Sequence, residues 1–388
     1  MHLKRAFAVV VFAGMLPQAA LAQDPEPPKA WRSLAFPAVG AVAFAGLASL
    51  AESGHEGAFC AQKSCLMTIG GVSGAIIGFL LGSDLDEKAR ARWTPAPQLS
   101  VAREGGSVPR NTLRLSPHPG GLAALSADGV VLLTPTLSTR VLLADRSVRA
   151  VAPLPSEDVI LAAADSAVLS VPLEGGAVDT VLLARVTALA ATPGGDVILG
   201  GRDRLERARL SGGSGGRQLV VSASGPLTGV PLALSAASGG PIWVAVDTLL
   251  EARDPAGLEV LGALALGGYP QDLVVAGRTA LLAMGAAGVI VVDVSDPARP
   301  REVARLTDAR TAHAVAVAGQ ELYVAGGGQG LFVYRLGGQG ATLAGVVGDL
   351  GLVTDVAADA SYVWTLDRTG SRVTRLEGAG SLAAGAAR

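Results

Sequence analysis

The residues best placed to do chemistry together are polar side chains that recur at equivalent positions along the chain. Asp272, His313 and Asp355 lie 41 and 42 residues apart, each at the start of a short apolar run, and Gln271 precedes Asp272. With Arg149 at the start of an earlier run, these groups could hydrogen-bond a small ligand or a partner protein. They converge only if the apolar runs are neighbouring strands that begin on one side. The alternative is ordinary solvated or hydrogen-bonded loop polarity.

Other candidate chemistry is weaker. Asp293 and Asp296 flank Ser295 and could offer oxygen ligands to Ca²⁺, but a calcium loop needs more acidic ligands at tighter spacing, which favours a turn-forming role. The Gly-rich runs 211–216 and 326–330 do not open a helix after a strand, so we expect turns and not phosphate-binding loops. The sequence therefore predicts no catalytic residue, no metal site and no cofactor.

Composition narrows the function classes. The net charge is −2, 16% of the 388 residues are charged, and aromatic residues make up only 4%. Basic residues do not gather with aromatics, so nucleic-acid binding is unsupported. Half of the residues are apolar, and a core of Ala, Val and Leu is expected.

The elements that would position the polar residues are repeats. One apolar run recurs at intervals of 37 to 45 residues, beginning at positions 122, 159, 197, 242, 281, 322 and 362. A second short apolar run precedes most of these runs, and Gly, Pro, Asp and Ser residues separate the runs from one another. Seven units of four short strands predict a seven-bladed β-propeller over residues 98–378, because a small apolar sheet buries both faces only between two neighbours. A pair of β-sandwiches, a β-helix, or six or eight blades are the alternatives.

The last unit runs out of strands near Leu376, and residues 98–102 (QLSVA) could supply its missing outer strand. That pairing would join both ends of the propeller in one blade. Residues 379–388 are then expected to form a disordered tail.

One unit carries a family resemblance. Residues 288–297 (GVIVVDVSDP), with Pro300 and Val303, resemble the LVIVD repeat of bacterial and archaeal surface propellers. The next unit matches in part, since residues 330–335 (GLFVYR) lack the Asp and the Ser-Asp-Pro turn. The resemblance implies a propeller at the cell envelope and implies no reaction.

The N-terminus predicts export. Lys4 and Arg5 precede the apolar segment 6–16, and residues 20–22 (ALA) form a small-x-small cleavage site, so residues 1–22 are expected to be a signal peptide. An uncleaved anchor helix is the alternative. Residues 23–32 form a Pro-rich linker.

Residues 33–93 are expected to form an α-helical hairpin. Two uncharged apolar stretches, 33–51 and 66–83, flank a polar loop. Four glycines recur every fourth residue in the second stretch and would lie on one helix face, where another helix can pack closely: Gly70, Gly74, Gly78 and Gly82. The pattern resembles the glycine-zipper hairpins of bacterial envelope proteins and favours membrane insertion or association. A soluble hairpin packed on the downstream domain is the alternative.

Cys60 and Cys65 lie in the loop of this hairpin. Two thiols this close in an exported chain predict a local disulfide that pins the turn.

Taken together, the sequence predicts a mainly β protein: a seven-bladed propeller preceded by a signal peptide and a helical hairpin. The expected function is a non-catalytic protein-interaction scaffold in the periplasm or outer envelope, tethered or oligomerised by the hairpin, with an unidentified protein partner. A periplasmic enzyme or small-ligand-binding propeller that uses the channel mouth is the alternative, and an oligomeric pore formed by the hairpin is a third possibility.

Overall fold

The structure is a computed structural model. It describes residues 96–378 and Gly380, except 119–120, 135, 193, 214–215, 237–238 and 338–339. The predicted signal peptide, linker and hairpin lie outside the described residues, as do the zipper glycines, Cys60, Cys65 and residues 381–388. Within the described part, no helix has the length and apolarity needed to cross a membrane.

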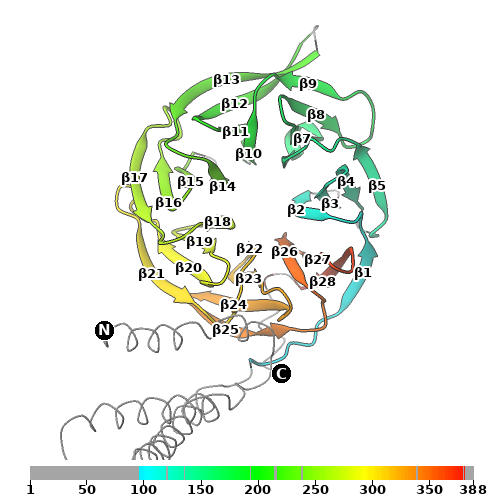
Figure 1. Cartoon of the computed structure of the whole chain (residues 1–388), viewed down its shortest axis with the longest axis vertical. Helices are drawn as coiled ribbons and strands as arrows, with labels where there is room; N and C mark the ends of the chain where they lie inside the picture. The colour runs from blue at the N-terminus through cyan, green and yellow to red at the C-terminus, as the bar shows by residue number, and fades with distance from the viewer. Residues whose placement is uncertain are drawn as a thin grey trace, which may run out of the picture. The chain divides into compact units, whose positions relative to one another are not determined.

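The described chain folds into seven four-stranded antiparallel sheets arranged as a ring, which confirms the seven-bladed propeller (Figure 1). The inner strands, which surround the central channel, are β2 (Thr112–His118), β6 (Ala150–Leu154), β10 (Val186–Ala191), β14 (Pro231–Ala236), β18 (Asp272–Ala276), β22 (Val315–Ala318) and β26 (Val353–Ala358). The second strands are β3 (Gly121–Ser126), β7 (Val159–Ala163), β11 (Asp196–Gly201), β15 (Ile242–Val246), β19 (Thr279–Ala283), β23 (Glu321–Ala325) and β27 (Tyr362–Asp367). The third strands are β4 (Gly129–Leu133), β8 (Val168–Pro172), β12 (Arg204–Gly213), β16 (Leu249–Arg253), β20 (Val289–Asp293), β24 (Leu331–Gly337) and β28 (Arg372–Glu377). The outer strands are β5 (Thr139–Leu143), β9 (Asp179–Leu182), β13 (Gly216–Pro226), β17 (Val260–Ala265), β21 (Arg301–Leu306), β25 (Gly340–Val347) and β1 (Arg103–Ser107).

Blades are numbered here from β2–β5 (blade 1) to β26–β28 with β1 (blade 7). Their core lies between the sheets. Seven clusters of buried apolar side chains fill the ring, and each is shared by two neighbouring blades. Second strands such as β7 and β15 are buried along their whole length, because they meet a neighbour on both faces. One blade alone would leave both faces of its sheet in water, so stability depends on packing between neighbouring blades around the closed ring.

The ring closes because a strand from the N-terminal end of the propeller completes the last blade. β1 pairs with β28, from Arg103 opposite Leu376 to Ser107 opposite Arg372, and completes blade 7. The closing strand was predicted at residues 98–102, which is five residues before its position in the structure. Instead Gln98 bridges Val346 of β25 in parallel, and the Leu99 N–H donates to the Val346 carbonyl at 2.8 Å.

The error has a physical cause. Leu99 is buried in the core between blades 6 and 7, so its apolar segment resembles a buried strand. The true closing strand, REGGS, faces solvent on the rim and needs no apolar side chains. Its Gly106 leaves room for the neighbouring turn, since a Cβ there would lie 2.9 Å from Leu137.

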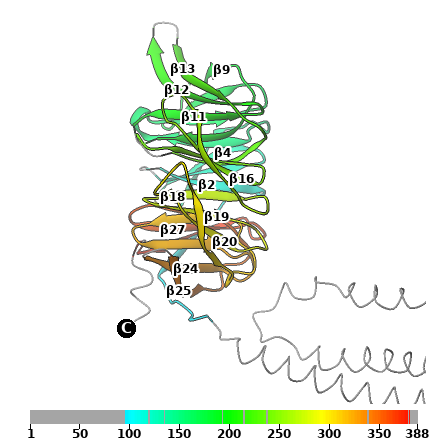
Figure 2. The same ribbon diagram turned by 90° about the vertical axis from the view of Figure 1, so that its left-hand side faces the viewer.

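Glycine also sets the start of the third strand in the repeat. Gly288 (φ 77°) and Gly330 (φ 92°) lie before β20 and in front of β24 in a backbone region that L-residues rarely adopt. A Cβ at either position would overlap the carbonyl of Leu306 or Val347 in the outer strand. The Gly-rich run 326–330 is a turn that connects β23 to β24, as predicted. In the run 211–216, residues 211–213 end β12 and Gly216 begins β13, while residues 214–215 lie outside the described residues. The β12–β13 hairpin projects from the ring (Figures 1 and 2).

Candidate functional site

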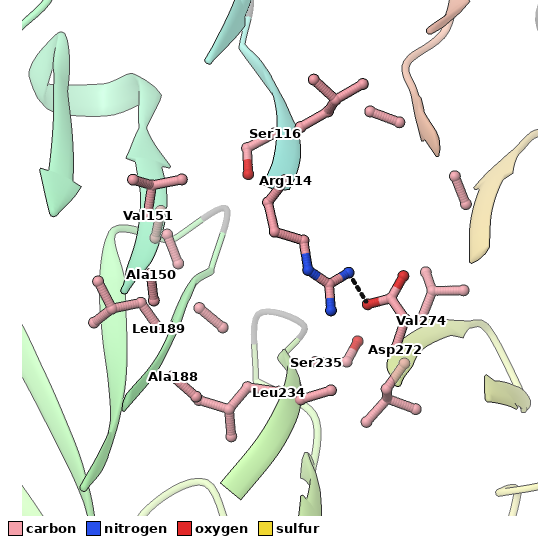
Figure 3. A pocket seen from close by; sticks show the side chains of 18 of the residues that line it. Arg114, Ser116, Ala150, Val151, Ala188, Leu189, Leu234, Ser235, Asp272 and Val274 are labelled. Carbon is pink, nitrogen blue, oxygen red and sulfur yellow. Dashed lines mark ion pairs between the residues drawn. The ribbon is translucent and has the colours of Figure 1, made fainter. Parts of the chain in front are cut away.

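A channel runs through the ring and encloses a cavity of about 750 Å³ lined by the seven inner strands. Inner strands carry mostly Ala, Val, Leu and Ser, so their side chains leave the axis open. One side of the cavity is polar and is formed from β2, β18 and β26. The opposite side, from β6, β10 and β14, is lined mainly by apolar side chains (Figure 3).

Arg114 on β2 is the centre of the polar side. Its guanidinium points across the channel to Asp272 on β18, with Nη1 3.3 Å from the carboxylate (Figure 3). The same nitrogen lies 3.7 Å from Asp355 on β26, and Nη2 donates to the Gln271 carbonyl at 2.6 Å. A single side chain from blade 1 thus contacts both blade 5 and blade 7.

The two carboxylates also hold neighbouring blades together. Asp272 Oδ2 accepts the N–H of Val315 on β22 at 3.0 Å, and Asp355 Oδ2 accepts the N–H of Leu115 on β2 at 2.6 Å. In each case the aspartate bonds the inner strand of the blade that follows it around the ring. Their position in the channel wall is therefore explained by packing of the ring as well as by any ligand.

Burial sets the electrostatics of the cluster. Asp355 is 2% exposed, and this burial raises its pKa to about 7, with Arg114 acting against the rise and Asp272 adding to it. The Asp272 carboxylate, in turn, raises the pKa of Arg114, so the guanidinium stays charged. Near neutral pH the cluster holds one full ion pair and one carboxyl that is close to its titration point.

The other predicted site residues divide into two groups. Gln271 and His313 lie together, with Oε1 and Nδ1 3.3 Å apart. Burial, with a smaller contribution from Arg368, lowers the pKa of His313, so its ring is neutral at pH 7. Arg149 reaches the cavity, but its ion pair is with Asp165 at 3.1 Å and not with the other four residues.

Sequence reasoning missed Arg114, the residue that joins the cluster. The inner strand of the first unit reads TLRLSPH, and its internal Pro117 makes it a poor match to the apolar inner runs used for the alignment. A usable signal was present, since Arg114 is the one Arg or Lys in the seven inner strands, and Asp272 and Asp355 are their two acidic residues.

The face of the ring on which the inner strands begin is called the channel-mouth face here. Twelve large apolar side chains of the described residues are exposed. Six of them lie on connections into inner strands or at the first residues of these strands on this face: Leu113, Leu183, Val230, Leu232, Tyr269 and Leu352. Only Val178 lies in a connection on the opposite face, and the other five lie on outer strands. Of the two faces of the ring, the channel-mouth face thus carries six of the exposed large apolar side chains and the opposite face one.

No group of three or more His, Cys, Asp or Glu side chains with metal-binding geometry occurs in the described residues. The aspartates of the Ser-Asp-Pro turn form the turn itself. Asp293 Oδ1 accepts the Ser295 N–H at 3.0 Å, and Asp296 Oδ1 accepts the Ala298 N–H at 3.1 Å. This confirms the turn-forming role.

Comparisons with known proteins agree with this architecture. Residues 267–308, which contain blade 5, match the LVIVD repeat. No curated protein sequence matches the chain. The protein is therefore a seven-bladed β-propeller that carries an LVIVD repeat in its fifth blade.

Three solved structures show how widely the fold is shared. The β-propeller domain of Myceliophteria thermophila Cps50 (Swd1) is 14% identical, with a TM-score of 0.57, over 71% of this chain and 100% of that domain. Staphylococcus aureus virginiamycin B lyase is 11% identical, with a TM-score of 0.55, over 72% of this chain and 100% of its own. YCF48 bound to D1 peptide is 13% identical, with a TM-score of 0.55, over 73% of this chain and 99% of its own. At these identities the similarity establishes the fold alone.

The raised pKa of Asp355 predicts a specific pH dependence. Because this pKa lies above the ordinary value of 3.8, the folded protein binds the proton more tightly than the unfolded chain. The free energy of unfolding should then fall as pH rises from about 4 to 7, by up to roughly 1.4 kcal/mol per pH unit. Asp355→Asn keeps an acceptor for the Leu115 N–H and removes the titration. We expect the stability of the variant relative to the parent to rise across this window and to level off above pH 7.

Urea unfolding from pH 4 to pH 8 measures this difference. At pH 4 the folded states of both proteins carry an uncharged group at this position, so that measurement supplies the reference point for the difference. A difference between variant and parent that stays constant over the whole range would contradict the assignment.

Proposed function

We propose that this protein is a non-catalytic protein-interaction scaffold of the cell envelope, and that partners bind on the channel-mouth face. The observation that carries the proposal is the gathering of six exposed large apolar side chains around one end of the channel, against one on the opposite face. Exposed apolar side chains cost free energy in water, and their concentration on one face is typical of an interaction surface.

The chemistry inside the channel also favours binding over catalysis. A lyase shares the fold, so the fold does not separate the two classes. Asp272 and Asp355 each accept a backbone N–H from the next blade and face Arg114. Carboxylates engaged in this way hold the wall in place, whereas a general base needs access to a substrate proton. A peptide bound to the YCF48 propeller is consistent with a binding role for such a ring.

The proposal extends to the N-terminal region on the basis of its sequence. A signal peptide over residues 1–22 would export the chain, and a hairpin over residues 33–93 would tether or oligomerise the propeller through the face that carries Gly74 and Gly78. The propeller would then present its channel-mouth face to partners in the periplasm or outer envelope.

Charged substitutions on the channel-mouth face should abolish partner capture. The tagged full-length chain is cross-linked in expressing cells and purified, and the proteins recovered are compared between variants. The double variant Tyr269→Lys/Leu352→Lys should lose the partners bound by the parent, because a lysine ammonium is costly to desolvate at an apolar contact. The matched control, Val141→Lys/Val260→Lys, changes positions on outer strands that are 65% and 50% exposed, against 68% and 36% for Tyr269 and Leu352, and should retain the partners. Equal recovery with the channel-mouth variant, or loss with the control, would contradict the proposal.

Alkaline extraction of membranes tests the tether. If the hairpin is inserted, the propeller stays in the membrane pellet, as detected by blotting. Gly74→Leu/Gly78→Leu places bulky side chains in the groove and should reduce the size of the cross-linked oligomer. Release of the parent protein into the supernatant, together with an unchanged oligomer size in the variant, would remove the hairpin from the proposal.

A further inference from the structure

The central channel has two unlike sides, and the protein-binding role does not use this difference. The side formed by β6, β10 and β14 has the strand sequences AVAPL, VTALAA and PLALSA, none with a charged residue. Leu189 and Leu234 line this side of the cavity (Figure 3). Each is partly buried and also packs against the core between its own blade and the preceding one. Arg149, directly before β6, also lines the cavity, and it is paired with Asp165 at 3.1 Å. A mainly apolar wall opposite a concentrated polar cluster is the arrangement of a ligand pocket.

The dimensions suit an elongated molecule. The cavity of about 750 Å³ lies within the usual range for small-molecule sites. Its walls are strands of four to seven residues, and five residues of strand span roughly 16 Å. The ligand is therefore long and narrow, with most of its length against apolar side chains.

The polar side of the cavity determines which polar group a ligand needs at one end. The Arg114 guanidinium has five N–H donors, and its partners in the structure are the Gln271 carbonyl and the two carboxylates. These contacts use three of the five donors, and the side chain is 40% exposed, so two donors remain for a ligand. A ligand that offers an acceptor to these donors makes a charge-assisted hydrogen bond.

Charge selects against ionised head groups. The Arg114 guanidinium lies within 4 Å of the Asp272 and Asp355 carboxyl groups, so its positive charge is opposed within the cluster itself. An anion would meet one or two carboxylates within the same cluster. A cation would approach the outward-facing donors of Arg114 and would lose its hydration beside an apolar wall. An uncharged head group avoids both costs.

We propose that the channel binds an elongated apolar molecule that carries one uncharged hydrogen-bonding head group, a hydroxyl or a primary amide. Its chain lies along β10 and β14, and its head group accepts a hydrogen bond from Arg114. The hydroxyl or amide hydrogen can be donated to Asp272, whose carboxylate faces the same side of the channel.

Photoaffinity labelling of the full-length protein tests the site and its selectivity. The probe is an octanol analogue with a diazirine on its chain, and labelled peptides are mapped by mass spectrometry. Label should appear in the peptides that contain residues 186–191 and 231–236. Unlabelled 1-octanol should displace the probe at concentrations roughly tenfold lower than octanoate or octylammonium, as expected for one hydrogen bond gained without a charge penalty. Label confined to other peptides, or displacement by an ion at equal or lower concentration, would overturn the proposal.

Two variants separate the chain from the head group. Leu189→Trp narrows the apolar side without touching the charged cluster and should abolish labelling of both strands. Arg114→Gln removes the charged donors and should erase the preference for octanol. Val141→Trp, on outer strand β5 and away from the channel, is the control and should label like the parent. Circular dichroism and thermal unfolding verify that each variant is folded, and if Arg114→Gln does not fold, Leu189→Trp decides alone.

Unchanged labelling in Leu189→Trp would overturn the proposal. Failure of this inference is distinct from failure of the protein-binding role, because partner capture is tested by Tyr269 and Leu352, which do not line the cavity. A protein that captures partners but takes up no octyl compound would retain the scaffold function and lose the ligand site.

Discussion

Closure of the ring is the constraint on which the rest of this structure depends. Each blade buries its sheet only against two neighbours, so an open chain of seven blades would expose two apolar sheet faces. The pairing of β1 with β28 joins the ends and removes them. Inside the ring, Asp272 and Asp355 also join neighbouring blades. Each accepts a backbone hydrogen bond from the inner strand of the following blade. Arg114 compensates the negative charge that these two aspartates place in the channel wall.

Closure also determines where function can lie. Once the strands are paired and the blade faces are packed together, the surfaces left for binding are the channel, the two faces of loops and the outer edges. The channel-mouth face carries six exposed large apolar side chains and the opposite loops carry one, which supports the proposed partner-binding face. The channel combines an apolar side with a charge-balanced polar side. The two proposed sites differ in chemistry, so binding at one can be tested separately from binding at the other.

The sequence predicted the architecture well because the repeat is a packing requirement. Seven recurrences of a buried second strand gave the blade number, and the repeat glycine before β20 and β24 follows from close approach of the outer strand. The closing strand was misplaced because burial of Leu99, between blades 6 and 7, does not depend on pairing in blade 7. The convergence of the polar residues was predicted in part: Asp272 and Asp355 both lie near Arg114, whereas Arg149 pairs with Asp165. Arg114 was missed because its strand contains Pro117 and departs from the repeat pattern, and which charged residue compensates a buried carboxylate depends on three-dimensional contacts between blades.

The most direct test of the account is hydrogen–deuterium exchange of the full-length protein, alone and in complex with a protein that it captures. Connections on the channel-mouth face, including residues 227–232, 267–272 and 348–353, should exchange more slowly in the complex. Outer strands β13 and β17 and the connections on the opposite face should be unchanged. Protection confined to the outer strands or to the opposite face would show that partners bind elsewhere and would contradict the account.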